Sequence, residues 1–222
     1  MLFVGLQFII WSISGTYMVL MDIHYIHGDT LIANNKTSIN SDKINYSIKS
    51  LLNEYPEAKS IKLGLLLDKA VYRFSDANNK VMLSAEDGQR LSSIKVAAAI
   101  KIARQHYVNK DAQISAATLI TQNPPRELSS RLLPVWRIDF DDFASPTFYI
   151  SANSAELVTK RHSFWRIFDW MFAFHVMDYI DESADNKLLL ITSVLAILAS
   201  IFGVMLTYYR LAPIQTSIRR KR

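Results

Sequence analysis

The sequence predicts an α+β domain held between two membrane-spanning helices. Three observations lead to this fold class. Two long stretches of the 222-residue chain contain no charged residue. The region between them switches between helical and strand periodicity. A short motif within that region occurs twice, in similar surroundings. We therefore expect a helix packed on a small antiparallel sheet, built twice and anchored at both ends.

The two uncharged stretches cover residues 1–21 and 188–209. Each is long enough to cross a hydrocarbon core of about 30 Å at roughly 1.5 Å of rise per helical residue. A secretory signal peptide is the alternative for the first stretch, but this stretch has no basic start and no small-residue cleavage site. We predict transmembrane helices over 1–22 and 188–209.

The distribution of charge orients these helices. The formal net charge is +5, and five cations follow the second stretch: Arg210, Arg219, Arg220, Lys221 and Arg222. Basic residues beside a span mark its cytoplasmic side. We therefore predict a basic cytoplasmic tail over 210–222 and a periplasmic region over 22–187, in a bacterial inner membrane. A short basic flank with no basic fold around it argues against nucleic-acid binding.

The composition and motifs argue against catalysis by this chain alone. Cysteine is absent, which excludes disulfides, thiolate metal sites and cysteine nucleophiles. The sequence has no zinc-peptidase motif, no serine-hydrolase motif and no glycine-rich phosphate loop. A role as a binding or regulatory module fits these observations better than an enzyme does.

The first module is predicted over residues 29–91. Its apolar residues recur at the spacing of one helical face: Ile44, Ile48, Leu51, Leu52 and Tyr55. Ser41 is the expected N-cap of this helix, and Pro56 is its expected stop. Three strands should follow, at 60–67, 70–75 and 81–84, with a hairpin turn over 76–80.

The second module is predicted over residues 92–161. A helix over 92–107 should present four residues on one face: Val96, Ile100, Ala103 and Tyr107. Strands are expected at 113–121, 132–142 and 146–151. Within the middle strand, apolar residues on one face alternate with charged residues on the other: Trp136, Ile138 and Phe140 against Arg137, Asp139 and Asp141. With Asp142, these acids form either a solvated face, which we favour, or a cation site.

The repeated motif ties the two modules together. "LSAEDGQRL" (83–91) matches "ISANSAELV" (150–158) at Leu83 and Ile150, at Ser84 and Ser151, and at Ala85 and Ala152. In both copies an apolar run ends in a polar turn and then resumes. The module is thus predicted to occur in tandem.

Three segments resemble the PepSY-associated transmembrane family, which includes iron-regulated membrane proteins: "SGTYMVLMDIHYIHGD" (14–29), "LPVWRIDFDD…PTFYISANSAELVTKR" (133–161) and "WRIFDWMFAFHVMDY" (165–179). The resemblance spans nearly the whole chain and implies a tandem PepSY-like periplasmic domain. PepSY modules are associated with inhibition or regulation of peptidases, and membrane relatives with iron uptake and with haem-carrying reductases of ferric siderophores. Two features depart from the family: the usual histidine-bearing cationic segment before the first span is missing, and Ala155 replaces a usual glycine. The alanine argues against a tight turn with positive φ there.

Three histidines are the candidate cofactor ligands. A b-type haem needs two axial imidazoles from facing helices. If the first helix continues past residue 22, His24 or His27 could lie opposite His175. The alternative is that all three are interfacial residues, apolar in body and polar at the tip. Haem ligation by two spans would require a homodimer or another membrane protein.

The aromatic segment 163–182 is predicted to be an interfacial helix that holds the periplasmic module on the lipid bilayer or on a partner protein. Its membrane-interface residues are Trp165, Phe168, Trp170, Phe174 and Tyr179. Asp169 and Asp178 would be costly at mid-membrane depth, which argues against a third span. Ala199 and Gly203 in the second span form a small-xxx-small pair that would permit close helix packing or homodimerisation.

Overall fold

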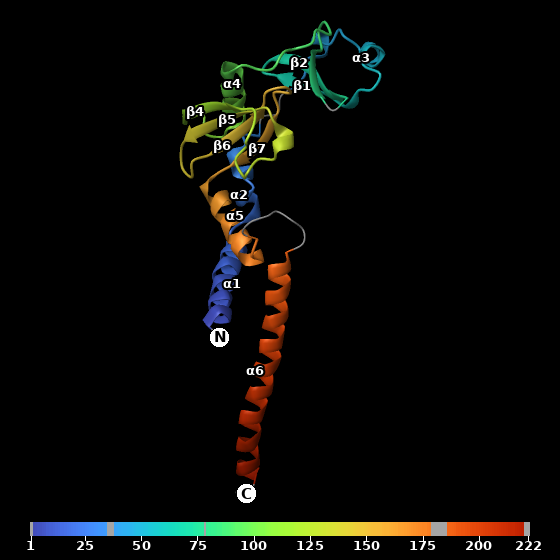
Figure 1. Cartoon of the computed structure of the whole chain (residues 1–222). Coiled ribbons are helices and arrows are strands. Elements are labelled where there is room, and N and C mark those ends of the chain that lie inside the picture. The colour runs from blue at the N-terminus through green and yellow to red at the C-terminus, as the bar shows by residue number, and fades with distance from the viewer. Residues whose placement is uncertain (1, 35–37, 78, 179–185, 220–222) are drawn as a thin grey trace. The chain divides into compact units, whose positions relative to one another are not determined.

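The structure, a computed structural model, describes residues 2–34, 38–77, 79–178 and 186–219 (Figure 1). The chain divides into two compact units. Unit 1 comprises Met1–Met21 and Ile167–Arg222, and unit 2 comprises Asp22–Arg166. The predicted α+β class is confirmed, because unit 2 contains two antiparallel sheets with helices.

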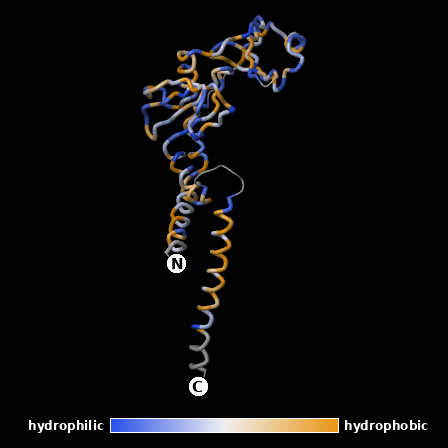
Figure 2. The backbone as a smooth tube through the Cα atoms, in the orientation of Figure 1, coloured by the Kyte–Doolittle hydropathy of each residue, from blue (hydrophilic) through white to orange (hydrophobic). Residues whose placement is uncertain are grey.

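Unit 1 is helical. It contains α1 (Leu2–Leu20), most of α5 (Ser163–Val176) and α6 (Lys187–Arg219). In α6, the stretch Lys187–Leu211 is 25 residues long and apolar enough to cross a membrane (Figure 2), and almost none of it is buried. It is the one helix of that length and apolarity in the described part of the chain; the apolar stretch of α1 is shorter, Gly5–Leu20. The second predicted span thus has the necessary helix, and the first remains a prediction.

The first sheet of unit 2 has the order β1-β2-β3 and is antiparallel throughout. Its strands are β1 (Lys59–Leu66), β2 (Lys69–Asp76) and β3 (Asn79–Ser84), close to the predicted ranges. The short helix α3 (Ile48–Glu54) covers one face through Leu51, which is fully buried.

The helix predicted to begin at Ser41 is shorter than expected. Residues Ser41–Lys43 form a separate 3-10 turn (η2), and the N-cap of α3 is Ser47, whose side chain accepts from the Ser50 N–H. Hydrogen bonds made by the residues between η2 and α3 explain the later start of the helix. The N–H groups of Asn45 and Tyr46 both donate to the carbonyl of Ala85 at 3.0 Å. These bonds hold the chain away from a helical conformation, although its apolar spacing is helical.

The second sheet has the order β4-β5-β6-β7 and is also antiparallel. Its strands are β4 (Gln113–Ile120), β5 (Val135–Asp141), β6 (Thr147–Ser151) and β7 (Leu157–Arg161). The first three match the predicted strands. Only three strands were predicted here, so β7 is a correction: the chain turns after β6 and pairs back along it.

Helix α4 (Val96–His106) lies beside the second sheet (Figure 1). Its buried residues are Ala99, Ile102 and Ala103, and Val96 is 39% exposed, so the buried face is rotated from the predicted one. The helix ends without a glycine. Instead, Lys110 Nζ donates to the carbonyls of Arg104, Gln105 and Tyr107 at 2.9, 2.9 and 2.7 Å. A cation at this position also suits the negative end of the helix dipole.

One hydrophobic core joins the two sheets. It contains α4, the inner face of the second sheet with Ile138, Phe140 and Phe148, and two residues of the first sheet, Val71 and Met82. Trp136 packs against the same cluster, so the predicted alternation along β5 is confirmed. A second core lies on the other face of the first sheet, and a third lies on the other face of the second sheet.

The two copies of the repeated motif form equivalent turns. Gly88 and Ala155 both have positive φ, at 75° and 55°. Each donates its N–H at 2.9 Å to the carbonyl four residues earlier, of Ser84 and Ser151 respectively. The expectation that Ala155 argues against a positive-φ turn is therefore wrong. Alanine tolerates this conformation here because the surrounding backbone hydrogen bonds fix the turn.

In each copy the alanine that follows the serine accepts from the chain entering the helix. The Ala85 carbonyl accepts from Tyr46 N–H at 3.0 Å, and the Ala152 carbonyl accepts from Ile94 N–H at 2.8 Å. Tyr46 and Ile94 each directly precede the N-cap residue of their helix. The two copies thus have matching connections between helix and sheet.

Candidate functional site

The predicted histidine ligands belong to different units. His175 lies in α5 within unit 1, whereas His24 and His27 lie in unit 2. The first helix does not continue into the two histidines as expected. It ends at Leu20, and Asp22 caps a separate short helix, α2 (Ile23–Ile26), by accepting from the Tyr25 N–H at 2.8 Å. The bis-histidine pair therefore remains a prediction.

His175 is held against α1 by three neighbours. Its Nδ1 lies 3.0 Å from Ser14 Oγ, and its carbonyl accepts from Trp11 Nε1 at 2.8 Å. A Cβ added at Gly15 would lie 3.3 Å from the ring, so glycine gives the imidazole room to approach the helix. Ser14 is 1% exposed. The imidazole of His175 is thus a positioned group rather than a loose surface side chain.

The hydrogen-bond network also assigns the proton on the His175 ring. Ser14 Oγ donates its single proton within α1, to the carbonyl of Ile10 at 2.7 Å. When that bond takes the single Ser14 proton, Ser14 accepts from His175, and this arrangement fits the Nδ1–H tautomer. In the neutral form of that tautomer, the lone pair is on the other ring nitrogen, Nε2. A donated Nδ1–H with an available Nε2 is the arrangement that metal-binding histidines commonly use.

His24 and His27 lie on the surface of unit 2. The side chain of His24 is 78% exposed, and its Nδ1 is 3.3 Å from Asp29 Oδ2. Lys160 donates to the other oxygen of Asp29 at 3.1 Å, and this bond, with the one from His24, lowers the pKa of Asp29. His27 is exposed and forms the C-cap of α2. In unit 2, His24 thus belongs to an ionic surface cluster.

The aromatic segment is a helix from Ser163 to Val176, within the predicted interfacial helix. Trp170 is 59% exposed, with its ring centre 5.8 Å from that of Phe174. Trp165 lies under the guanidinium of Arg161, 4.0 Å away, and Phe168 is half-buried. Tyr179 lies outside the described residues. The exposed aromatic side chains remain consistent with an interfacial role.

The outer face of the second sheet carries a polar network that the sequence did not predict. Arg166 Nε donates to Glu127 Oε2 at 2.8 Å, and its Nη2 donates to Glu127 Oε1 and to Thr147 Oγ1, both at 3.0 Å. The buried Tyr149 hydroxyl donates to Glu127 at 2.6 Å. This network ties the first turn of α5 to the sheet and to the segment before β5. A double hydrogen bond between Arg and a carboxylate fixes orientation as well as position.

The acids of β5 are not simply a solvated face. Asp139 accepts from Thr147 Oγ1 at 2.7 Å and from Arg137 Nε at 3.0 Å. Asp142 accepts from the Tyr107 hydroxyl at 2.6 Å and from Asn109 at 2.7 Å, bonds that lower its pKa. Asp141 is exposed. No group of three metal-ligating side chains occurs among the described residues, so no cation site is assigned here.

Two further histidines lie in unit 2. His162 is 1% exposed and its Nε2 donates to the Tyr25 carbonyl at 2.9 Å, while Nδ1 has no partner in the described structure. Burial lowers the pKa of His162 and also that of His106. His106 lines a cleft of about 800 Å³. The other lining residues come from the chain before α3, from the β1–β2 hairpin and from α4: Ala33, Asn34, Ser38, Asn40, Lys43, Leu65, Leu67, Asp68, Ala70 and Gln105.

Comparison with protein families, curated proteins and solved structures finds no match for this chain. The similarity to PepSY-associated membrane proteins therefore rests on the sequence segments themselves.

Proposed function

We propose that the chain is a PepSY-type binding or regulatory module of the periplasm, anchored in a bacterial inner membrane and not itself catalytic. The observation that carries this proposal is the pair of equivalent turns at Gly88 and Ala155. Matching turns, each joined to the entry of a helix, are what a duplicated helix-on-sheet module would produce. The apolar helix α6 supports the membrane anchor.

The topology is tested with paired reporters, one active only in the cytoplasm and one active only in the periplasm. Each is fused after residue 222 or inserted after Val108, which is 52% exposed. We expect cytoplasmic activity at the C-terminus and periplasmic activity at Val108. A periplasmic C-terminus would overturn the proposed orientation, because the basic tail would then lie on the wrong side.

The binding role is tested by site-specific photo-crosslinking of the full chain in cells. A photoreactive amino acid at Trp170, which is 59% exposed, reports on α5, and one at Leu119, which is 43% exposed, reports on the edge strand β4. We expect a discrete adduct with another membrane or periplasmic protein at one of these positions. Adducts only with lipid, or none at either position, would contradict a protein-binding role for these surfaces.

A second candidate function is a haem-b electron-transfer component of a ferric-siderophore or metal reductase. The specific observation that favours it is the 3.0 Å contact between His175 Nδ1 and Ser14 Oγ, which fits an Nδ1–H tautomer whose Nε2 could bind a haem iron. His175 is the only histidine of unit 1. A second imidazole would come from a second copy or from a partner membrane protein, and His24 and His27 remain the sequence-predicted candidates for it. Bound haem would supply one-electron chemistry, and this chain would position it.

An absorption spectrum of the detergent-purified protein, made with ample haem and recorded oxidised and then reduced, separates the two candidates. The reductase function predicts a Soret band and sharp reduced α and β bands that disappear in His175→Ala. The matched control is His106→Ala, which alters a half-buried histidine of unit 2 and should leave these bands intact. Protein without haem would leave His175 as a membrane-interface residue.

A further inference from the structure

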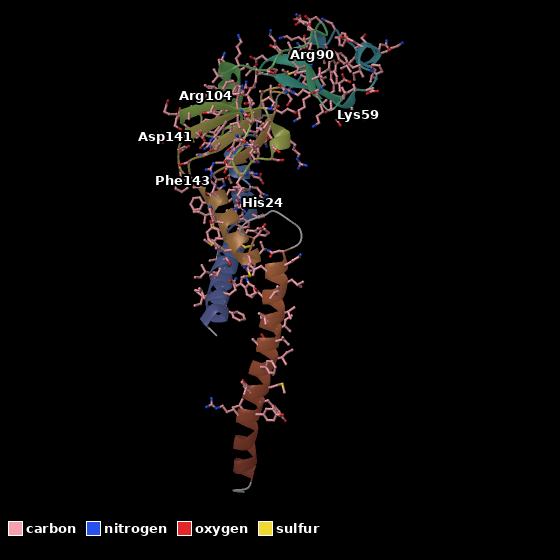
Figure 3. The ribbon with its side chains drawn as sticks, viewed as in Figure 1. His24, Lys59, Arg90, Arg104, Asp141 and Phe143 are labelled. Atoms are coloured by element: carbon pink, nitrogen blue, oxygen red, sulfur yellow. The ribbon has the colours of Figure 1, made fainter. Side chains whose placement is uncertain are left out.

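Phe143 is the most exposed large hydrophobic residue among the described residues of unit 2, at 75%. It lies in the hairpin between β5 and β6, and Figure 3 places it with His24 at one end of the unit, while Lys59 and Arg90 lie at the other. A single exposed apolar residue needs no functional explanation by itself. The position of Phe143 and the hydrogen bonds that hold its hairpin do point to a function.

The hairpin is fixed from both sides. Asp142, which precedes Phe143, accepts from the Phe143 N–H at 2.7 Å and from Tyr107 and Asn109. On the other side, the Ala144 carbonyl accepts from the Ser163 N–H at 2.8 Å, which ties the hairpin to the first residue of α5. Both Ala144 and Ser145 have positive φ. The fold therefore holds an aromatic side chain outward on a braced turn.

This end of unit 2 is also where the chain enters and leaves it. The ring of Phe164 lies 5.9 Å from Phe143 and 5.6 Å from Tyr25, so the three aromatic residues form one cluster. Tyr25 is three residues from the start of the unit, and Phe164 is two residues from its end. Both ends continue directly into the apolar helices of unit 1.

We infer that Phe143 is a membrane anchor: the β5–β6 hairpin inserts this ring at the boundary between lipid headgroups and acyl chains and so fixes the orientation of unit 2 on the bilayer. The inference rests on the proposed membrane anchoring. Phenylalanine is among the apolar residues that interfacial segments bury at this boundary. The occupant is lipid, because both connections at this end lead into apolar helices.

The absence of cysteine makes the test direct, since one introduced thiol carries one fluorescent label. The full chain is placed in phosphatidylethanolamine–phosphatidylglycerol vesicles with an environment-sensitive label at Phe143→Cys, Lys59→Cys or Leu198→Cys. Lys59 is the aqueous control at the opposite end of unit 2, and Leu198, in α6, is the lipid control (Figure 3). We expect the label at position 143 to emit at shorter wavelength than the label at 59, to be quenched by nitroxide lipids and to be shielded from aqueous iodide.

Each other outcome overturns the inference in a distinct way. Iodide quenching at 143 equal to that at 59 would leave the hairpin in water. Shielding from iodide without quenching by nitroxide lipids would show that a protein, either a second copy or a partner, covers Phe143. If the label at 198 is not quenched by lipid, the proposed membrane anchor itself fails, and this inference fails with it.

A second pair of variants keeps the test valid if labelling residue 143 disturbs the turn. Ser145→Cys places the label at an exposed neighbour and keeps Phe143. Its quenching by nitroxide lipids should be lost when Phe143→Ser is added, because the hairpin then has no apolar ring to insert. Unchanged quenching in the double variant would overturn the role of Phe143.

Discussion

The two sheets of unit 2 form the same turn with different residues. After β3 the positive-φ position is Gly88, and a Cβ there would clash with the ring of Tyr46. After β6 the same position is Ala155, whose methyl group is 4% exposed and belongs to the shared core. The backbone hydrogen bonds are equivalent in both. The comparison shows that backbone hydrogen bonds determine the conformation of the turn. The residue allowed at the positive-φ position depends on the side chains that pack against it.

The largest expected effect tests whether the two sheets are one folding unit. Phe148→Ala should lower the free energy of unfolding by about 3–5 kcal/mol, because the ring is fully buried in the shared core. Since Val71 and Met82 of the first sheet contribute to that core, both sheets should lose stability together. Denaturant unfolding in detergent should show one transition, shifted to lower denaturant.

The control for this prediction is Ile48→Ala, which changes a side chain that is 53% exposed and should alter stability by less than about 0.5 kcal/mol. A Phe148→Ala protein that unfolds in two steps, with the first sheet retaining its original midpoint, would contradict a common core.

The next effect separates the two turns. Gly88→Ala should destabilise by about 2–4 kcal/mol, because it adds both a left-handed backbone penalty and a clash with Tyr46. Ala155→Gly should change stability by less than about 1 kcal/mol, because relief of the backbone penalty offsets the lost methyl contact and the added chain entropy. Thermal unfolding of the two variants measures this asymmetry. If both variants lose the same stability, glycine at 155 relieves no backbone penalty, and the two positions do not share one turn conformation.

The third expected effect, smaller than that of Gly88→Ala, concerns a feature of the second sheet, the Glu127–Arg166 pair. Glu127→Gln should cost about 1–2 kcal/mol at neutral pH by weakening a charged hydrogen bond. Burial raises the pKa of Glu127, but the hydrogen bonds from Arg166 and Tyr149 outweigh it, and the pKa lies below its ordinary value of 4.5.

The sign of the pH dependence follows from that lowered pKa. Ionised Glu127 stabilises the folded chain fully above about pH 4.5, and this contribution is lost as pH falls through the lower pKa of the folded state. The difference in unfolding free energy between the original chain and Glu127→Gln should therefore shrink as the solution is acidified below pH 4.5. A difference that stays constant with pH would argue against an ionised pair.

The sequence predicted the strands well where side chains alternate, as along Trp136, Ile138 and Phe140. It missed β7 because all five residues of Leu157–Arg161 are partly buried and show no alternation. It placed a helix start at Ser41 because the apolar spacing is helical, whereas the Ala85 carbonyl, distant in sequence, decides the backbone there.

Prediction of the site was limited in the same way. The aromatic segment identified His175, but its partners Trp11 and Ser14 are more than 160 residues away in the chain. The tryptophan–arginine motif was visible, yet nothing in the sequence paired Arg166 with Glu127. Such partners depend on tertiary packing, which periodicity does not encode. Helix α1 also carries hydroxyls at Ser12 and Thr16, so nothing in its sequence singles out Ser14.

The cap on α4 has a consequence for the chemical reactivity of the chain. Lys110 donates from its ammonium group to three backbone carbonyls. Acylating reagents react only with an amine that has lost a proton and is free of such bonds. Lys110 should therefore be acylated slowly while the end of α4 is intact, and rapidly once that turn opens. Its modification rate relative to an exposed lysine such as Lys59 would report local opening of α4 from within the native protein.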